Sequence, residues 1–359
     1  MEYPSIEKVS INSIDGVLHC KIILDRAPET QPQFAFYVFR NYERIHTEWY
    51  TKNQSFEFDT QGKPGCYHLQ GFVKFDEDKT EQSISSSLFI NSLEVSPESF
   101  PGADHKAVAY SLKGKSWNFP ALYYPSECES LFVLMPSAVN RKKSVLPAFN
   151  RWTWAVDGVF PGNVLCISDP TLELHHDLEI GWCLGDKDNC ATTELSEFVI
   201  NLADSKGIPR ERIVIYGSSA GGFAALALSA CIEGSIAVAI NPQVDALSYS
   251  ATSQVDLLSK TCFDMPKDII RRDFADRVDM TTRWQNVESS RAFFVQNILD
   301  EHHYKVHFKP IWQALGGDPE QEGISYSGRH IAWVYRQDGG HVPETKEMAN
   351  KIIEILNLQ

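Results

Sequence analysis

From about residue 105 onward, short apolar runs alternate with segments that have a helical pattern. The apolar runs cover residues 131–135, 163–167, 212–216, 235–240, 292–296 and 330–335. Short, nearly continuous apolar runs rich in β-branched residues are typical of strands that helices cover on both faces. Strand–helix alternation over about 250 residues therefore predicts an α/β fold with an open, mostly parallel sheet.

The first hundred residues have a different pattern. Runs rich in β-branched and aromatic residues are separated by turn-forming clusters, and they cover residues 17–24, 34–40, 55–58, 66–75 and 83–90. Short strands at this spacing predict a small all-β, sandwich-like domain. Val95–Asp104 contains two prolines and a glycine, so we expect a β domain over 1–100 and an α/β domain over 105–359.

Composition and charge exclude several classes of protein. The chain has 33 basic and 47 acidic residues and a net charge of −14, which argues against a nucleic-acid-binding protein. No run approaches the roughly 18 uninterrupted apolar residues of a membrane span. The N-terminus lacks the pattern of a secretory signal and the eight cysteines are scattered, so we expect a cytoplasmic protein with reduced thiols.

The segment Gly217–Gly222 lies between the run 212–216 and a stretch of good helix formers. It matches G-x-S-x-G, with Ser219 at the centre. A serine at a sharp strand-to-helix turn projects its hydroxyl from the sheet, and small neighbours avoid a collision at such a turn. The helix that begins there presents free N–H groups to a developing negative charge. The motif therefore predicts that Ser219 is a nucleophile.

With this motif, and with AspGlyGlyHisVal at 338–342, residues 105–359 resemble the α/β-hydrolase superfamily. The whole chain is also similar to bacterial surface-polysaccharide O-acetyltransferases and accessory-secretion esterase-like proteins. Besides the small β domain, the segments that carry this second resemblance are 150–154, 168–172 and 181–185. The resemblance implies an α/β-hydrolase fold and acyl-ester chemistry on a carbohydrate.

A nucleophilic serine needs a base and an acid that orients the base. The resemblance implies the chain order serine, acid, histidine, and His341 follows the last strand run, so it is the predicted base. The acid is expected just past the preceding strand, where Asp300 is the first candidate. Asp245, one strand earlier, is the alternative.

Two backbone N–H groups are expected to form an oxyanion hole. One belongs to Ala220, directly after the serine. The other belongs to Ser137 or Ala138, in the loop of small residues that follows the run 131–135.

Three further features are candidates for substrate binding. Arg141 and Lys142 begin a basic run that either forms a solvated turn or attracts an anionic substrate. Trp152 either stacks on a sugar or packs in the core. The mixed segment 246–284 is predicted to form a helical cap over the site.

Together these features predict a serine-dependent acyl-ester enzyme that works through an acyl-enzyme, with a carbohydrate acetyl esterase as the first interpretation. The alternatives are an O-acetyltransferase of a surface polysaccharide, with acetyl-CoA as donor, and a non-catalytic hydrolase-fold scaffold. We expect no other cofactor and no metal, because the histidine pairs at 175–176 and 302–303 lack ligand spacing. The expected partner is a small-molecule or glycan ester.

Overall fold

The computed structural model describes residues 3–41, 43–63, 65–77, 79–85, 87–90, 93–95, 108–141, 144 and 146–358. The chain divides into two compact units, one formed mainly by the first 94 residues and the other mainly by the residues from 111 onward. The predicted boundary segment Val95–Asp104 lies outside the described residues except for Val95.

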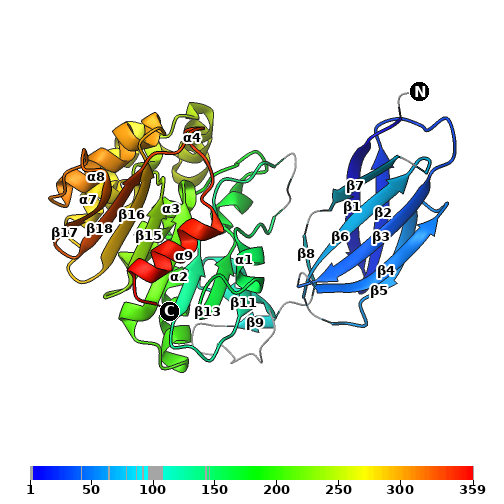
Figure 1. Ribbon diagram of the computed structural model, residues 1–359, viewed down its shortest axis with the longest axis horizontal. Coiled ribbons are helices and arrows are strands. Elements are labelled where there is room, and N and C mark those ends of the chain that lie inside the picture. The colour runs from blue at the N-terminus through cyan, green and yellow to red at the C-terminus, as the bar shows by residue number, and fades with distance from the viewer. Residues whose placement is uncertain are drawn as a thin grey trace. The chain divides into compact units, whose positions relative to one another are not determined.

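The first unit contains two antiparallel sheets, with strand orders β1-β2-β5 and β4-β3-β6-β7, and β8 pairs with β6 (Figure 1). The strands are β1 (Ile6–Ile14), β2 (Val17–Leu24), β3 (Gln33–Arg40), β4 (Glu43–Thr51), β5 (Ser55–Asp59), β6 (Gly65–Lys74), β7 (Thr80–Ile84) and β8 (Leu88–Ile90). Val9 and Ile22 of one sheet share a buried core with Phe36 and Leu69 of the other. The two sheets therefore pack face to face, which confirms the sandwich-like fold.

The sequence pattern does not predict β1 and β4. β4 has no fully buried residue and lies at the edge of its sheet, so its sequence carries little apolar signal.

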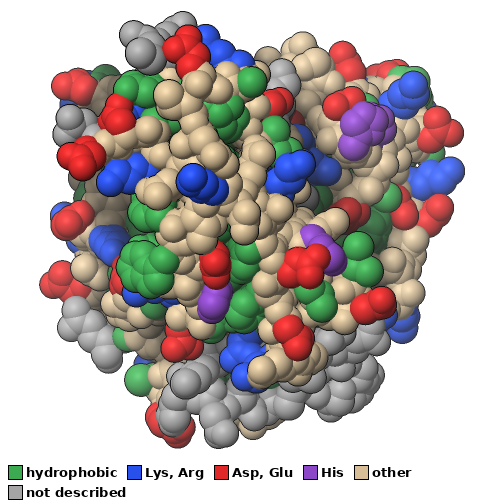
Figure 2. All heavy atoms as spheres, turned by 90° about the vertical axis from the view of Figure 1, so that its right-hand side faces the viewer, with side chains coloured by type: hydrophobic (Ala, Val, Ile, Leu, Met, Phe, Trp, Pro, Cys, Tyr) green, Lys and Arg blue, Asp and Glu red, His purple; other side chains and the backbone are tan. Residues whose placement is uncertain are grey.

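Over the face that Figure 2 shows, acidic side chains are interspersed with lysines and arginines.

The second unit contains most of a ten-stranded sheet with the order β17-β18-β16-β15-β14-β12-β13-β11-β10-β9. Its strands are β9 (Leu93–Val95), β10 (Val108–Lys113), β11 (Asn118–Tyr124), β12 (Leu131–Leu134), β13 (Asn163–Ile167), β14 (Ile213–Ser218), β15 (Ile236–Ile240), β16 (Arg291–Asn297), β17 (Gly323–Ser327) and β18 (His330–Tyr335). Six neighbouring strands pair in parallel, in the order β13-β12-β14-β15-β16-β18. β11 pairs antiparallel with β13, and β17 pairs antiparallel with β18. Every residue of β12, β13 and β15 is buried, because both faces of the sheet are covered.

Helices flank this sheet (Figure 1). The α-helices are α1 (Trp152–Val156), α2 (Ala191–Ser205), α3 (Ala220–Ser229), α4 (Thr252–Leu258), α5 (Lys267–Asp273), α6 (Ala275–Val278), α7 (Met280–Trp284), α8 (Lys309–Ala314) and α9 (Lys346–Ile355). α2 buries one apolar stripe, which includes Leu195, Phe198 and Leu202. Among the described helices, none combines the length and apolar character of a membrane span.

The parallel strands determine where the candidate residues meet. Ser219 follows β14, Asp245 follows β15, Asp300 follows β16 and His341 follows β18. The carboxyl ends of neighbouring parallel strands lie along one edge of a sheet, and ligand sites of open α/β sheets lie outside that edge. Residues that are far apart in the sequence are thereby brought together.

Candidate active site

Ser219 occupies a strained turn between β14 and α3. Its backbone has φ 54° and ψ −119°, in the region of positive φ that side-chain-bearing residues rarely adopt. The neighbouring glycines make this turn possible. A Cβ atom on Gly217 would lie 2.1 Å from the carbonyl oxygen of Gly221, and one on Gly222 would lie 2.8 Å from Pro242 Cβ. The backbone N–H of Ser219 donates to the carbonyl of Ile240 on β15 (2.9 Å), which ties the turn to the sheet.

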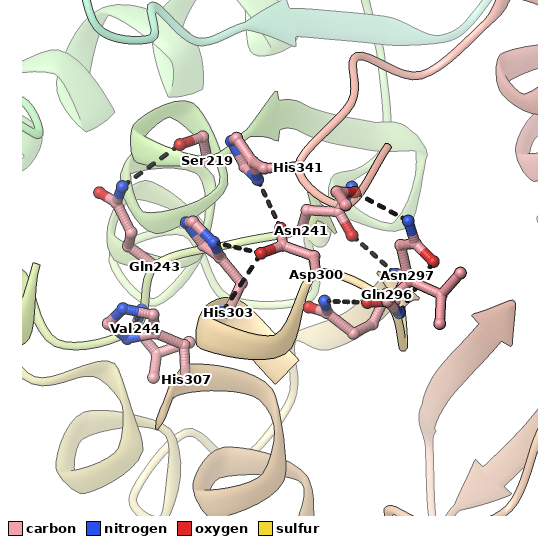
Figure 3. A network of polar contacts seen from close by, with 12 residues as sticks. Ser219, Asn241, Gln243, Val244, Gln296, Asn297, Asp300, His303, His307 and His341 are labelled. Atoms are coloured by element: carbon pink, nitrogen blue, oxygen red, sulfur yellow. Dashed lines mark hydrogen bonds and ion pairs between the residues drawn. The ribbon is translucent and has the colours of Figure 1, made fainter. Parts of the chain in front are cut away.

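His341 lies beside Ser219 and is hydrogen bonded to Asp300 (Figure 3). The distance from His341 Nδ1 to Asp300 Oδ2 is 2.5 Å. Burial alone would raise the pKa of Asp300, but hydrogen bonds from His303 and His341 hold it well below its usual range. Asp300 is therefore ionised at neutral pH, so Nδ1 of His341 carries the proton and Nε2 is free to accept one.

The alternative acid, Asp245, is engaged elsewhere. Its carboxylate accepts from Arg271 Nη1 at 2.7 Å, from Ser248 Oγ at 2.6 Å and from the backbone N–H of Leu247 at 2.9 Å. These contacts make it the N-cap of a short 3₁₀ turn, Ala246–Ser248. Of the two candidate acids, Asp300 is the one that contacts His341.

His303, which the sequence analysis did not single out as a site residue, shares Asp300 with His341. Its Nδ1 lies 3.0 Å from Asp300 Oδ1. Its ring stacks on that of His341 with centroids 4.1 Å apart and an interplanar angle of 11°. Burial lowers the pKa of His303, so the ring is neutral and donates its Nδ1 proton to the carboxylate. The i, i+3 spacing of Asp300 and His303 at the start of a helical segment was the available signal.

These three side chains bring metal-ligand atoms within 4.8 Å of one another. Direct hydrogen bonds satisfy the carboxylate and the two Nδ1 atoms, whereas Nε2 of His303 is buried without a partner among the described residues. A second such group, at 175–177, comprises a half-buried His175 and the exposed His176 and Asp177.

The structure distinguishes the two candidates for the second oxyanion donor. The N–H of Ser137 donates to Asn150 Oδ1 at 3.1 Å. Ala138 is exposed beside the serine cavity, and its N–H has no hydrogen-bond partner in the described part of the chain. Ala220 is the first residue of α3, so its N–H has no partner within the helix. Ala220 and Ala138 therefore offer free backbone donors.

Ser219, His341, Ser137 and Ala138 all line one cavity of about 480 Å³. Its other lining residues are Asn150, Arg151, Thr153, Trp154, Ser218, Asn241, Tyr249, Val342, Pro343 and Glu344. The wall combines two aromatic side chains with several amide and hydroxyl groups. A pocket of this composition fits a polar ligand that also presents an apolar face.

Arg151 and Glu344 form a buried ion pair in the wall of the cavity, with side chains 8 % and 2 % exposed. Arg151 Nε donates to Glu344 Oε1, and Nη2 donates to Ser218 Oγ at 2.6 Å. The pair thus joins the loop after β12, the end of β14 and the segment before α9. Ser218 is held in this contact beside the nucleophile position.

The weaker substrate-binding candidates lie elsewhere. Arg141 donates to the carbonyl of Leu172 at 3.2 Å and is not among the lining residues, and neither is Trp152. Lys142 lies outside the described residues. The neighbouring tryptophan, Trp154, lines the cavity instead. Of the helical segment 246–284, only Tyr249 does so.

No family model and no curated protein matches this chain. Many solved structures do. The capsule O-acetyltransferase of Neisseria meningitidis serogroup A is 12 % identical, with 72 % of this chain and 96 % of that chain covered and a TM-score of 0.52. A structure of a variant of it in complex with CoA covers 70 % of this chain and 94 % of that chain at 12 % identity, with a TM-score of 0.51.

Prolyl oligopeptidase B from Galerina marginata is 11 % identical, with 97 % of this chain and 57 % of that chain covered and a TM-score of 0.51. The structural neighbours are hydrolases and acyltransferases, and at these identities the likeness establishes the fold. The chain has the α/β-hydrolase fold, as these structural likenesses, the mostly parallel sheet and the strained serine turn together indicate.

Proposed function

We propose that this protein is a serine-dependent acyl-ester enzyme. The observation that carries the proposal is the placement of Ser219, at a strained turn, beside an imidazole that is bonded to a buried, ionised carboxylate. This is the arrangement that serine nucleophiles use on this fold. Ser219, His341 and Asp300 act as nucleophile, base and orienting acid.

In the proposed reaction, Ser219 Oγ forms a bond to the acyl carbon while its proton passes to His341 Nε2. The electron pair of the carbonyl moves to the oxygen, which the N–H groups of Ala220 and Ala138 stabilise. The bond to the leaving group then breaks, and the proton on His341 goes to that group. Water or a sugar hydroxyl then attacks the acyl carbon and gives its proton to His341. The bond between the acyl carbon and Ser219 Oγ breaks, and Oγ recovers the proton from His341.

The described contacts include no hydrogen bond between Ser219 Oγ and His341. Such contacts are often long in the absence of substrate and shorten when the substrate binds. Both side chains line the same cavity, where the substrate would bind between them.

We infer hydrolysis of a carbohydrate acetyl ester as the first reaction. His341 is 43 % exposed, so water reaches the base that would activate it. Trp154 and Tyr249, together with the amide of Asn150, give the cavity the stacking and polar groups that a sugar requires.

O-acetyl transfer from acetyl-CoA to a polysaccharide is the second candidate. The observation that favours it is the likeness to a capsule O-acetyltransferase, of which nearly the whole chain is covered and a variant binds CoA. Transfer requires an acceptor hydroxyl to compete with water for the acyl-enzyme.

Labelling of the full chain by a fluorophosphonate probe tests the catalytic proposal. We expect labelling of the wild type and none of Ser219→Ala, with Ser218→Ala as the matched control that retains labelling at Ser219. Equal labelling of Ser219→Ala contradicts the proposal. Absence of both labelling and turnover of short-chain acyl esters favours the non-catalytic scaffold.

Two assays separate the two reactions. In one the substrate is acetylated xylan, and in the other it is acetyl-CoA together with a de-acetylated capsular glycan. Acetate release from the glycan supports hydrolysis. Appearance of acetyl groups on the acceptor supports transfer, whereas loss of the thioester alone does not.

A further inference from the structure

Gln243 approaches Ser219 from the side of the sheet, behind the cavity. Its Nε2 donates to Ser219 Oγ at 3.2 Å (Figure 3). Its backbone N–H donates to the carbonyl of Ser219, also at 3.2 Å. Gln243 follows β15, is completely buried and does not line the cavity. It therefore reaches the nucleophile without reaching the substrate.

The orientation of the Gln243 amide is fixed by Trp182. The indole Nε1 lies 2.5 Å from Gln243 Oε1. An indole N–H can only donate, so the amide oxygen must face Trp182 and the amide nitrogen must face Ser219. The opposite orientation would place two donors against each other in a buried site.

Trp182 is itself held in a strained loop. Trp182 and Cys183 both have φ 53°, in the left-handed region that favours glycine. The N–H of Cys183 donates to Oδ2 of the buried Asp169 at 3.0 Å, which fixes this backbone. A Cβ on Gly181 would lie 2.7 Å from the same carboxylate oxygen, so the loop passes close to Asp169 only because this residue is glycine. Strain of this kind persists where the surrounding structure enforces it, often at functional sites.

We propose that Gln243 is a catalytic residue of the same site and that Trp182 is its positioning residue; the inference rests on the proposed function. As a donor, the amide occupies a lone pair of Ser219 Oγ and leaves the hydroxyl proton for His341. A reversed amide would accept that proton and compete with the base.

The donated hydrogen bond acts in both halves of the reaction. It stabilises the partial negative charge on Oγ while the proton moves to His341 Nε2 and the bond to the acyl carbon forms. It acts again when that bond breaks, because Oγ is then the leaving group and recovers its proton from His341. Gln243 contacts Ser219 Oγ but does not contact the substrate. We therefore expect its loss to lower kcat and to leave KM unchanged.

The test compares four variants of the full chain, Gln243→Met, Gln243→Glu, Trp182→Phe and Trp182→Phe/Gln243→Met. Gln296→Met is the matched control, since Gln296 is equally buried and its amide donates to the carbonyl of Asn297 rather than to the serine. The readouts are the rate of fluorophosphonate labelling and kcat and KM for p-nitrophenyl acetate. Thermal unfolding verifies that each variant is folded.

We expect Gln243→Met to lower the labelling rate and kcat about tenfold, with KM within about twofold of the wild type. Trp182→Phe keeps an aromatic ring but removes the indole N–H and so frees the amide of Gln243 to rotate; we expect at least the same loss. The double variant should be no slower than Gln243→Met, because Trp182 acts through the glutamine. Gln243→Glu keeps an acceptor for the indole and offers a second acceptor to the serine, so it should be the slowest single variant.

An unchanged or faster rate for Gln243→Met, or additive losses in the double variant, overturns the inference. If either result is found while the wild type is labelled at Ser219, the proposed function stands and only the inference about Gln243 fails. If the wild type is not labelled, the proposed function and the inference fail together. Should Gln243→Met not fold, a wild-type rate in Gln243→Glu and Trp182→Phe overturns the inference in its place.

Discussion

Replacement of His303 tests how the carboxylate of the proposed triad is held. Phenylalanine at this position keeps a ring that can stack on His341 but removes the N–H that donates to Asp300. Asparagine keeps a donor near the position of Nδ1 and removes the ring. The two variants therefore separate the contacts at 3.0 Å and 4.1 Å that His303 makes.

The expected magnitude follows from the burial of the carboxylate. Asp300 is 5 % exposed, so the oxygen that loses the imidazole donor cannot be hydrated freely and keeps only the backbone N–H of residue 303, at 3.5 Å. A hydrogen bond to a charged group contributes about 1.5–3 kcal/mol. We expect His303→Phe to lower the free energy of unfolding by about 2 kcal/mol and to raise the pKa of Asp300.

A carboxylate that is free to rotate also orients His341 less well, so we expect kcat/KM of His303→Phe to fall about tenfold. His303→Asn should retain most of the activity. The assay is hydrolysis of p-nitrophenyl acetate from pH 5 to 9, with chemical denaturation of each variant. Wild-type activity in His303→Phe, or equal losses in both variants, would refute the reasoning that the hydrogen bond rather than the stack is what matters.

Three other outcomes are expected. Gly217→Ala should destabilise the fold by about 3 kcal/mol and abolish labelling, because its Cβ has no room beside the backbone of the serine turn; a folded, reactive variant would contradict this geometry. Glu344→Gln should lower the free energy of unfolding by about 3 kcal/mol, measured by chemical denaturation, because Arg151 stays buried without its counter-charge. The control is Glu322→Gln, in an exposed pair, which should change this free energy by about 0.5 kcal/mol at most. Burial lowers the pKa of His307 to about 3, so the unfolded chain binds more protons below pH 6.5 and stability should fall as the pH drops from about 6.5 towards 3; a decline equally steep in His307→Gln would assign it to other groups.

The sequence predicts β12 to β16 and β18, because their nearly continuous apolar runs are typical of strands that are buried on both faces. It does not predict β9, β10 or β11. The predicted run 330–335 coincides with β18, and 163–167 coincides with β13. Edge strands are harder to predict. β17 pairs on one side only, and three of its five residues are exposed, so its sequence shows no continuous apolar run.

The same division applies to the candidate site. Ser219 could be predicted because its local backbone demands small neighbours, which leave a readable motif in the sequence. The choice between Asp300 and Asp245 could not be made locally, since both follow core strands and both suit a turn. It depends on which carboxylate lies within reach of a loop that follows β18.

The sequence by itself determined the fold class, the serine turn and the histidine that follows the last strand, because steric constraints and apolar periodicity act over a few residues. Only the tertiary structure assigned Asp300 to His341, Ala138 rather than Ser137 as a free donor, and Gln243 to the serine. These pairings join loops from different strands. Hydrogen bonds between such loops depend on distances of a few ångströms in space, which residue order does not specify.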